Sequence, residues 1–203
     1  MLTQAGTAHA DLPPAPWQLG QAGTSDTTPR EPRAQWVSAF TIDPATPAFL
    51  PLRGGNVGFP FALTCAPNEL VVGLWGRAGN TIDTLGLLCA RMRPNGTLGF
   101  TEQRPDLGNA MTPPFSLQCP KHEVIISLRG LAATKVDRLG GRCARVRAWV
   151  MQGKRGAVLP SVGGSMGLPF TDECPTGYML QGIVGFVNGT INAIQGLCVP
   201  IVT

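Results

Sequence analysis

The sequence lacks any uninterrupted run of about 18 apolar residues, which excludes a hydrophobic transmembrane helix. Charged residues make up only 14% and aromatic residues 6%, while 43% are hydrophobic, so the chain is too apolar to stay unfolded. A CxxC pair is absent, and His9 and His122 are the two histidines, which leaves too few ligands for a zinc site. Nucleotide-binding, EF-hand and HExxH motifs are missing too. We therefore expect no metal and no cofactor.

Turn-forming residues, by contrast, are abundant: the 203 residues include 26 glycines and 19 prolines. This composition is too rich in turns for a helical bundle and favours an all-β fold. The prolines are frequent in the first 50 residues, where aliphatic residues are few until Trp36–Phe40. We expect residues 1–50 to form an extended arm or edge-strand segment, followed by a folded domain over residues 51–203.

The six cysteines form three pairs with the same spacing, and each pair is 24 residues apart. A glycine lies 11 residues before each pair, at Gly54, Gly108 and Gly163, which places three repeats at about 54–107, 108–162 and 163–203. We expect each pair to form a disulfide within its repeat, in an oxidising compartment. The pairs are Cys65 and Cys89, Cys119 and Cys143, and Cys174 and Cys198. The segments between them align without a gap: CAPNELVVGLWGRAGNTIDTLGLLC, CPKHEVIISLRGLAATKVDRLGGRC and CPTGYMLQGIVGFVNGTINAIQGLC.

Each repeat is predicted to contain a β-hairpin. In the first repeat Leu70, Val72 and Leu74 alternate with their neighbours, which is typical of a half-buried strand. A second strand follows, in which Leu85 and the second cysteine share a face but Ile82 is out of phase by one residue. A β-bulge between Ile82 and Leu85 would restore the register, and the other repeats show the same pattern.

Each repeat starts with Cys-Pro or Cys-Ala, and the first repeat continues with a VxGLxGRxG strand and an IDxLGLxC strand. These features resemble the vitelline membrane outer layer protein family and, more distantly, the jacalin-related lectins. The resemblance covers residues 54–202 and implies a β-prism, in which three Greek-key sheets surround a pseudo-threefold axis with one sheet per repeat. Fold alone does not fix function.

The resemblance also implies a ligand site. Jacalin-type lectins bind sugar with a Gly-x-x-x-Asp loop, and Gly79-Asn80-Thr81-Ile82-Asp83 fits that spacing. The other repeats depart from it, and they carry Asp137 and Asn192 at the position of Asp83. We expect these three side chains to cap their own hairpins by bonding local backbone amides, with a sugar ligand as the alternative.

Basic residues are concentrated in the second repeat. Residues 119–155 contain nine lysines and arginines against two acids, Glu123 and Asp137, whereas no lysine or arginine follows Arg155. A basic face attracts anionic polymers, and a merely solvated sheet is the alternative. Nucleic acid is disfavoured because Trp149 is the only aromatic residue in this stretch. The residues predicted to form the face are Lys121, Arg129, Lys135, Arg138, Arg142, Arg145 and Arg147.

These patterns predict a secreted, non-enzymatic protein that binds carbohydrate or another surface polymer. No histidine lies in a catalytic arrangement, because His9 is in the arm and His122 lies between Lys121 and Glu123. Met1–Ala10 lacks the basic and apolar regions of a complete signal peptide, so secretion is inferred from the cysteines. The alternative is a structural protein of an envelope, matrix or particle, in which the arm bridges the subunits of a homo-oligomer.

Overall fold

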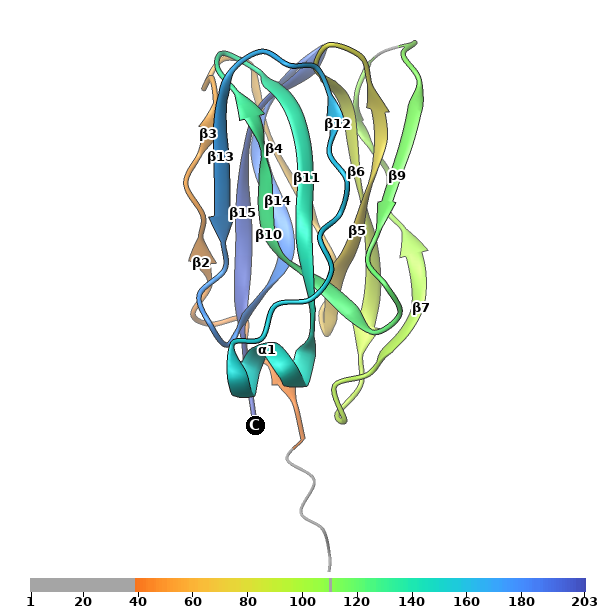
Figure 1. Cartoon of the computed structure of the whole chain (residues 1–203), viewed down its shortest axis with the longest axis vertical. Helices are drawn as coiled ribbons and strands as arrows, with labels where there is room; N and C mark the ends of the chain where they lie inside the picture. Colours follow the sequence, from red (N-terminus) through yellow and green to blue (C-terminus); the bar gives the residue numbers. More distant parts are fainter. Residues whose placement is uncertain (1–38, 110) are drawn as a thin grey trace, which may run out of the picture. The chain divides into compact units, whose positions relative to one another are not determined.

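The computed structural model describes residues 39–109 and 111–203. These residues form three antiparallel sheets and one short helix, so the predicted all-β fold is confirmed (Figure 1). No helix among them is long and apolar enough to cross a membrane. The elements are β1 (Thr41–Ile42), β2 (Ala48–Phe49), β3 (Arg53–Gly54), β4 (Phe59–Thr64), β5 (Glu69–Ala78), β6 (Ile82–Met92), β7 (Leu98–Gln103), β8 (Leu107–Gly108), β9 (Pro114–Gln118), β10 (Glu123–Ala132), β11 (Val136–Arg145), α1 (Val146–Gln152), β12 (Val162–Gly163), β13 (Leu168–Glu173), β14 (Tyr178–Asn188) and β15 (Thr190–Val202).

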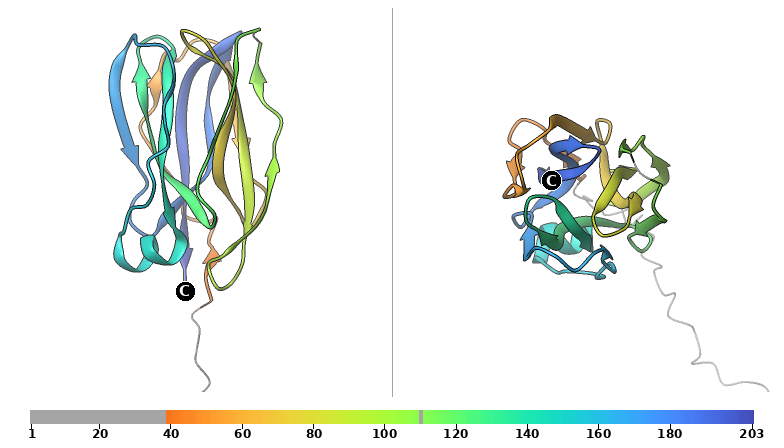
Figure 2. Two further views of the ribbon diagram at one scale, coloured as in Figure 1. Left: turned by 45° about the vertical axis from the view of Figure 1, so that its right-hand side comes forward. Right: turned by 90° about the horizontal axis from the view of Figure 1, so that it is seen from above.

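Each sheet is built around one of the predicted hairpins. The strand orders are β7-β6-β5-β9, with β8 also on β6; β12-β11-β10-β13; and β1-β15-β14-β4, with β2 and β3 also on β15. Seen from above, the three sheets surround a common centre (Figure 2). The three sheets of the expected β-prism are therefore present, with pseudo-threefold symmetry.

The expectation of one sheet per repeat is wrong, because every sheet combines two repeats. The hairpin β5–β6 of the first repeat pairs with β9, the opening strand of the second, and β10 pairs in the same way with β13 of the third. The hairpin β14–β15 of the third repeat closes the ring by pairing with β4 of the first. Cross-strand hydrogen bonds therefore join each repeat to the next.

The predicted bulges are confirmed in all three hairpins. Arg77 pairs with Thr84 and Ala78 with Ile82, so Asp83 is the extra residue in β6. The register shifts in the same way around Asp137 in β11 and around Asn192 in β15. A bulge of this kind turns the extra residue out of the ladder, which explains why the apolar phase slips by one residue at these positions.

The opening glycine of each repeat packs against a bulge. Gly54, Gly108 and Gly163 have φ angles of 106°, 111° and 107°, which side-chain-bearing residues rarely adopt. A Cβ atom at Gly108 would lie 2.1 Å from the carbonyl oxygen of Asp83, and equivalent contacts occur at the other two glycines. The triplicated glycine is therefore required both by its backbone conformation and by the close approach of another strand.

The predicted disulfides are confirmed: Cys65–Cys89, Cys119–Cys143 and Cys174–Cys198 are bonded. Each bond also joins two sheets, because the first cysteine follows an edge strand of one sheet and the second lies within a hairpin of another. For example, the Cys65 amide donates to the carbonyl of Gln181 in β14, whereas Cys89 lies in β6. The three bonds together link the three sheets in a ring.

Residues 39–50, which belong to the segment predicted as an arm, contribute strands to the β14–β15 sheet. Thr41 pairs with Val202, and Phe49 pairs with Leu197. Phe40 is buried in a cluster with Trp149, whose indole N–H donates to the carbonyl oxygen of Tyr178 at 2.7 Å. Residues 1–38 of the predicted arm lie outside the described residues.

Candidate functional site

The residues suggested by the lectin resemblance lie at the ends of the three hairpins. Asp83 is 6% exposed, and its carboxylate accepts hydrogen bonds of 2.7 Å from the hydroxyl groups of Thr81 and Thr112. Gly79 lies beside this carboxylate and bonds the carbonyl of Thr81, while Asn80 is exposed at the turn. Both oxygens of Asp83 are therefore already engaged, one of them by a residue from the next repeat.

The equivalent side chains are also buried, but they differ from Asp83 in their contacts. The amide nitrogen of Asn192 donates to the carbonyl of Val57 at 2.7 Å. In the second repeat a carboxylate oxygen of Asp137 is buried without a hydrogen-bond partner, because Gly167 stands where the first sheet has Thr112. Asp83 and Asn192 each join an opening loop to a hairpin: Asp83 accepts from the Thr112 hydroxyl, and Asn192 donates to the Val57 carbonyl. We expected them to bond local backbone amides instead, and these contacts differ from that expectation.

Replacing Thr112 by valine lowers the free energy of unfolding by about 1 to 3 kcal/mol, because the buried Asp83 carboxylate loses a donor without gaining water. Denaturant titration measures this change. Thr176→Val is the matched control, since Thr176 is exposed, and we expect it to shift the stability by less than about 0.5 kcal/mol. Equal effects of the two variants would contradict a structural role for the Thr112–Asp83 contact.

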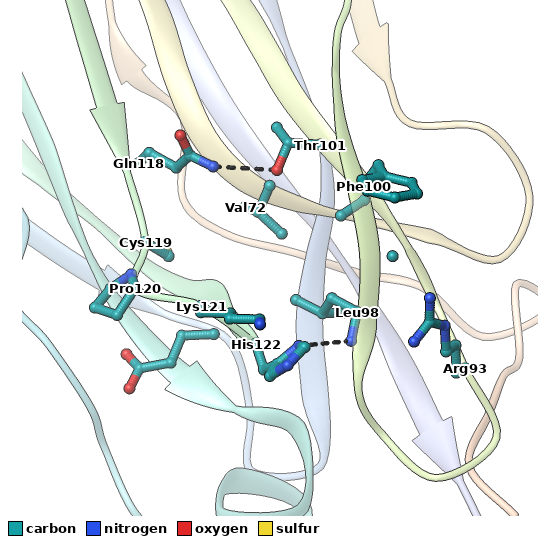
Figure 3. A pocket seen from close by; sticks show the side chains of 13 residues that line it. Val72, Arg93, Leu98, Phe100, Thr101, Gln118, Cys119, Pro120, Lys121 and His122 are labelled. Carbon is teal, nitrogen blue, oxygen red and sulfur yellow. Dashed lines mark hydrogen bonds between the residues drawn. The ribbon is translucent and has the colours of Figure 1, made fainter.

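A groove with more accessible polar groups lies between the β6–β7 hairpin and the loop that precedes β10. Its cavity has a volume of about 450 Å³ (Figure 3). Phe100, which is 92% exposed, and Arg93 line one wall, and Lys121 and His122 line the other. Gln118 and Thr101 also line the groove, and the Gln118 side-chain amide donates to the Thr101 hydroxyl at 3.1 Å. An exposed aromatic ring beside a few polar donors is typical of a small-molecule or sugar-binding surface.

A second cavity adjoins this groove and a third adjoins the second, since each neighbouring pair shares lining residues. The second, of about 550 Å³, shares His122 and Glu123 with the first and is also lined by Arg145, Arg147 and Lys154. The third, of about 530 Å³, shares Arg155 with the second and lies over β10, β11 and β13. We call the three cavities together the basic cleft. Its basic side chains are Arg93, Lys121, Arg129, Arg142, Arg145, Arg147, Lys154 and Arg155.

Local sequence features explain how these residues come together. His122 has a φ of 64°, and Asn68 and Gly177 have the same left-handed conformation at the equivalent turns. This turn places the His122 ring where its Nδ1 accepts a hydrogen bond of 3.2 Å from the amide of Leu98 (Figure 3). After its second strand the first repeat continues into β7, whereas the second repeat forms α1. The cleft lies between these two unlike extensions.

Two acidic residues, Glu123 and Glu173, lie in the cleft, and both already accept hydrogen bonds from the protein. Glu173 accepts two hydrogen bonds from Arg155, at 2.6 and 2.8 Å, and this contact raises the pKa of the Arg155 guanidinium above its ordinary value. Glu123 accepts a bond from the Ala157 amide. Eight basic groups therefore face two acids, which gives the cleft a positive potential. Within residues 39–109 and 111–203, no group of three or more His, Cys, Asp or Glu side chains is arranged to hold a metal.

Five of the seven basic residues singled out in the sequence line the cleft: Lys121, Arg129, Arg142, Arg145 and Arg147. Lys135 and Arg138 instead lie at the hairpin end of the same sheet. Sequence reasoning missed Arg93 and Phe100, because both belong to the first repeat and only the fold brings them beside the second. The available signal was an aromatic residue, Phe100, followed directly by the polar run Thr101–Gln103.

The fold matches solved structures of jacalin-related and other lectins. The Malaysian banana lectin is 20% identical, with a TM-score of 0.56, and the match covers 76% of this chain and 99% of the lectin. A mannose-binding jacalin-related lectin from Ananas comosus is 16% identical, with a TM-score of 0.54 and coverage of 76% and 98%. A mannose-specific jacalin-related lectin from Morus nigra is 14% identical, with a TM-score of 0.53 and coverage of 76% and 96%.

At these identities the likeness shows the β-prism fold and not the ligand. No protein-family model and no curated protein matches the sequence. The resemblance to the vitelline membrane outer layer family therefore stays a prediction.

Proposed function

We propose that this protein is a non-enzymatic carbohydrate-binding protein, and that its ligand is an acidic polysaccharide held in the basic cleft. The observation that carries the proposal is the clustering of eight basic side chains around three adjoining cavities, with Phe100 on one wall. Guanidinium groups match carboxylate and other oxyanion groups through paired hydrogen bonds. An aromatic face provides apolar contact for a sugar ring.

The length of the cleft favours a polymer over a single sugar. The cavities run from β7, past the loop before β10, to the face of the β10–β11 sheet. Each has a volume within the range of a small-molecule site, so together they can accept several sugar units. Many weak charge contacts along one chain release counterions and give an affinity that falls steeply with salt.

The hairpin-end residues are the less favoured sugar site. Gly79 and Asn80 lie in an accessible turn, but Asp83, Asp137 and Asn192 are only 6%, 8% and 7% exposed. A sugar hydroxyl would have to displace the Thr112 hydroxyl from Asp83 before it could bond that carboxylate. Exchanging one hydroxyl hydrogen bond for another gains little free energy, so a buried carboxylate whose oxygens are already bonded is a poor ligand site.

Secretion is part of the proposal, and it is supported by the three buried disulfides, which persist in oxidising compartments. The alternative, an assembly protein whose arm bridges subunits, rests on residues 1–38, which lie outside the described part of the chain. That alternative and the predicted domain boundary therefore stay predictions.

Binding to a sulfated glucan, compared with the same polysaccharide chain after desulfation, which leaves it uncharged, tests the proposed function. We expect calorimetric binding only to the sulfated form, with an affinity that falls as salt rises from 50 to about 200 mM. Arg93→Gln, Arg129→Gln and Arg145→Gln each remove one charge from a different cavity. We expect each variant to weaken binding by about 3- to 10-fold and to reduce the slope of log K against log salt by about one.

Lys135→Gln is the matched control, because it removes the same charge from the exposed turn between β10 and β11, outside the cleft. We expect it to leave the salt slope unchanged. If Lys135→Gln weakens binding as much as the three cleft variants, the attraction is a property of net charge and the cleft is not the site. Equal binding of the desulfated chain would contradict an acidic ligand.

A further inference from the structure

The three loops that follow the opening glycines carry exposed apolar side chains at equivalent positions. Three residues after the glycine are Val57, Met111 and Met166, which are 66%, 101% and 71% exposed. Two positions further are Phe59 and Leu168, at 75% and 76%, and the second repeat has proline there. Single exposed apolar residues are ordinary, but the same position exposed in all three repeats is a pattern. We call these five residues the apolar crown.

A described residue of each crown loop contacts a hairpin end. The carbonyl of Val57 accepts the Asn192 amide group, and the carbonyl of Pro113 accepts the Ala78 amide at 3.1 Å. Gly167 packs directly against the backbone of Ala132. All three loops therefore lie at the end of the prism that carries the hairpin turns. The described chain begins at Ala39 at the other end, near α1 (Figures 1 and 2).

This end of the molecule has almost no charge. The three crown loops, 55–59, 109–113 and 164–168, and the three hairpin turns, 78–82, 133–136 and 187–190, contain a single charged residue, Lys135. Arg77 lies just below, where its guanidinium donates to the carbonyl of Thr112. The nearby Asp83 and Asp137 carboxylates are buried behind the loops. Lys135 and Arg77 therefore give the loops and turns themselves a positive charge, while the acid next along the chain, Asp106, lies two residues before Gly108 and is partly exposed.

We propose that the apolar crown inserts into the interfacial region of a lipid bilayer that contains anionic lipids. Apolar side chains that project from rigid loops enter the boundary between headgroups and acyl chains, and adjacent cations contact the lipid phosphates. Lys135 and Arg77 are placed for that contact. The proposal is independent of the polysaccharide site, because no crown residue lines the basic cleft.

A second copy of the chain fits the crown less well than a bilayer does. The side chains stand on three separate loops and on the first residues of β4 and β13, and no residue of the described part of the chain packs against Met111, which is fully exposed. A rigid protein face would need hollows that match each projection at the density of a protein interior. Fluid acyl chains fill the space around any projection, so they need no such match.

Co-sedimentation with vesicles of phosphatidylcholine, with and without 30% phosphatidylglycerol, tests the proposal. We expect the folded protein to bind the anionic vesicles and to bind neutral ones more weakly. Met111→Ser/Met166→Ser removes two crown side chains and reduces the partition coefficient by about 100-fold, at about tenfold for each side chain. Met151→Ser is the matched control, because Met151 is 57% exposed but lies in α1 at the opposite end.

Unchanged partitioning of the double variant, or an equal loss in Met151→Ser, would overturn the proposal. Phe59→Ser/Leu168→Ser repeats the test at the second crown position, so misfolding of one variant leaves the other to decide. Light scattering of the protein without lipid measures its oligomeric state and so tests the alternative that a second copy covers the crown. A dimer that dissociates on substitution of the crown would assign the surface to a second copy instead.

Discussion

Replacing Cys119 and Cys143 together by alanine lowers the free energy of unfolding by about 3 to 4 kcal/mol. The bond closes a loop with a sequence separation of 24, and its removal returns the conformational entropy of that loop to the unfolded chain. The loss is large beside a typical net stability of about 5 to 15 kcal/mol. In the folded state the same bond holds the β5–β6 sheet against the β10–β11 sheet, so its loss also loosens that contact.

Guanidinium denaturation under oxidising conditions measures this change against the unsubstituted protein. The other two disulfides close loops of the same length, so the equivalent double variants at Cys65/Cys89 and Cys174/Cys198 serve as internal comparisons. On the chain-entropy account the three losses agree within about 1 kcal/mol. A loss below about 1 kcal/mol in all three would refute a stabilising role, and one outlying pair would indicate that the sheets differ in how they repack.

Gly108→Ala destabilises the protein by about 3 to 5 kcal/mol, which combines backbone strain with a steric clash. Its φ of 111° disfavours any Cβ atom, and that atom would also lie 2.1 Å from the Asp83 carbonyl oxygen and 3.0 Å from the Cα of Thr84. Both contacts are to backbone atoms of the bulge, which cannot move aside without breaking the pairing of β6 with β8.

Gly177→Ala separates strain from clash, because Gly177 also has a positive φ, of 87°, but has no atom within 4 Å of the added Cβ position. We expect a loss of about 1 to 2 kcal/mol for this control. Thermal and denaturant unfolding of both variants measures the difference between them. If Gly108→Ala is no worse than Gly177→Ala, the glycine is needed for its φ angle alone and the close packing against the bulge is unimportant.

The local structure was predictable because it is fixed by short-range patterns that occur three times. Leu70, Val72 and Leu74 predict a strand, and the phase slip between Ile82 and Leu85 predicts the bulge that occurs at Asp83. Equal cysteine spacing predicts the disulfides. In each case the deciding residues lie within 25 positions of one another, and the repetition supplies three independent readings of the same pattern.

The pairing between repeats was not predictable in this way. Whether β9 pairs within its own repeat or with β5 of the preceding one depends on how three hairpins pack around a shared core, and the repeat pattern is identical in both cases. The basic cleft was only partly predictable for the same reason. The density of arginines in the second repeat indicates a charged face, but Arg93 and Phe100 join it through tertiary contacts. Contacts between distant segments of this kind cannot be predicted from a local sequence pattern.

The β14–β15 sheet contains both the earliest and the latest strands of the described chain, since Thr41 in β1 pairs with Val202 in β15. During translation the other two sheets have all their strands once Glu173 has left the ribosome, whereas the β14–β15 sheet is complete only after Val202 has been added. A nascent chain therefore carries β4, with its exposed Phe59, as an unpaired edge for most of its synthesis. Unpaired strand edges promote aggregation, so we expect the yield of correctly folded protein to depend on how quickly the ribosome completes the β14–β15 hairpin.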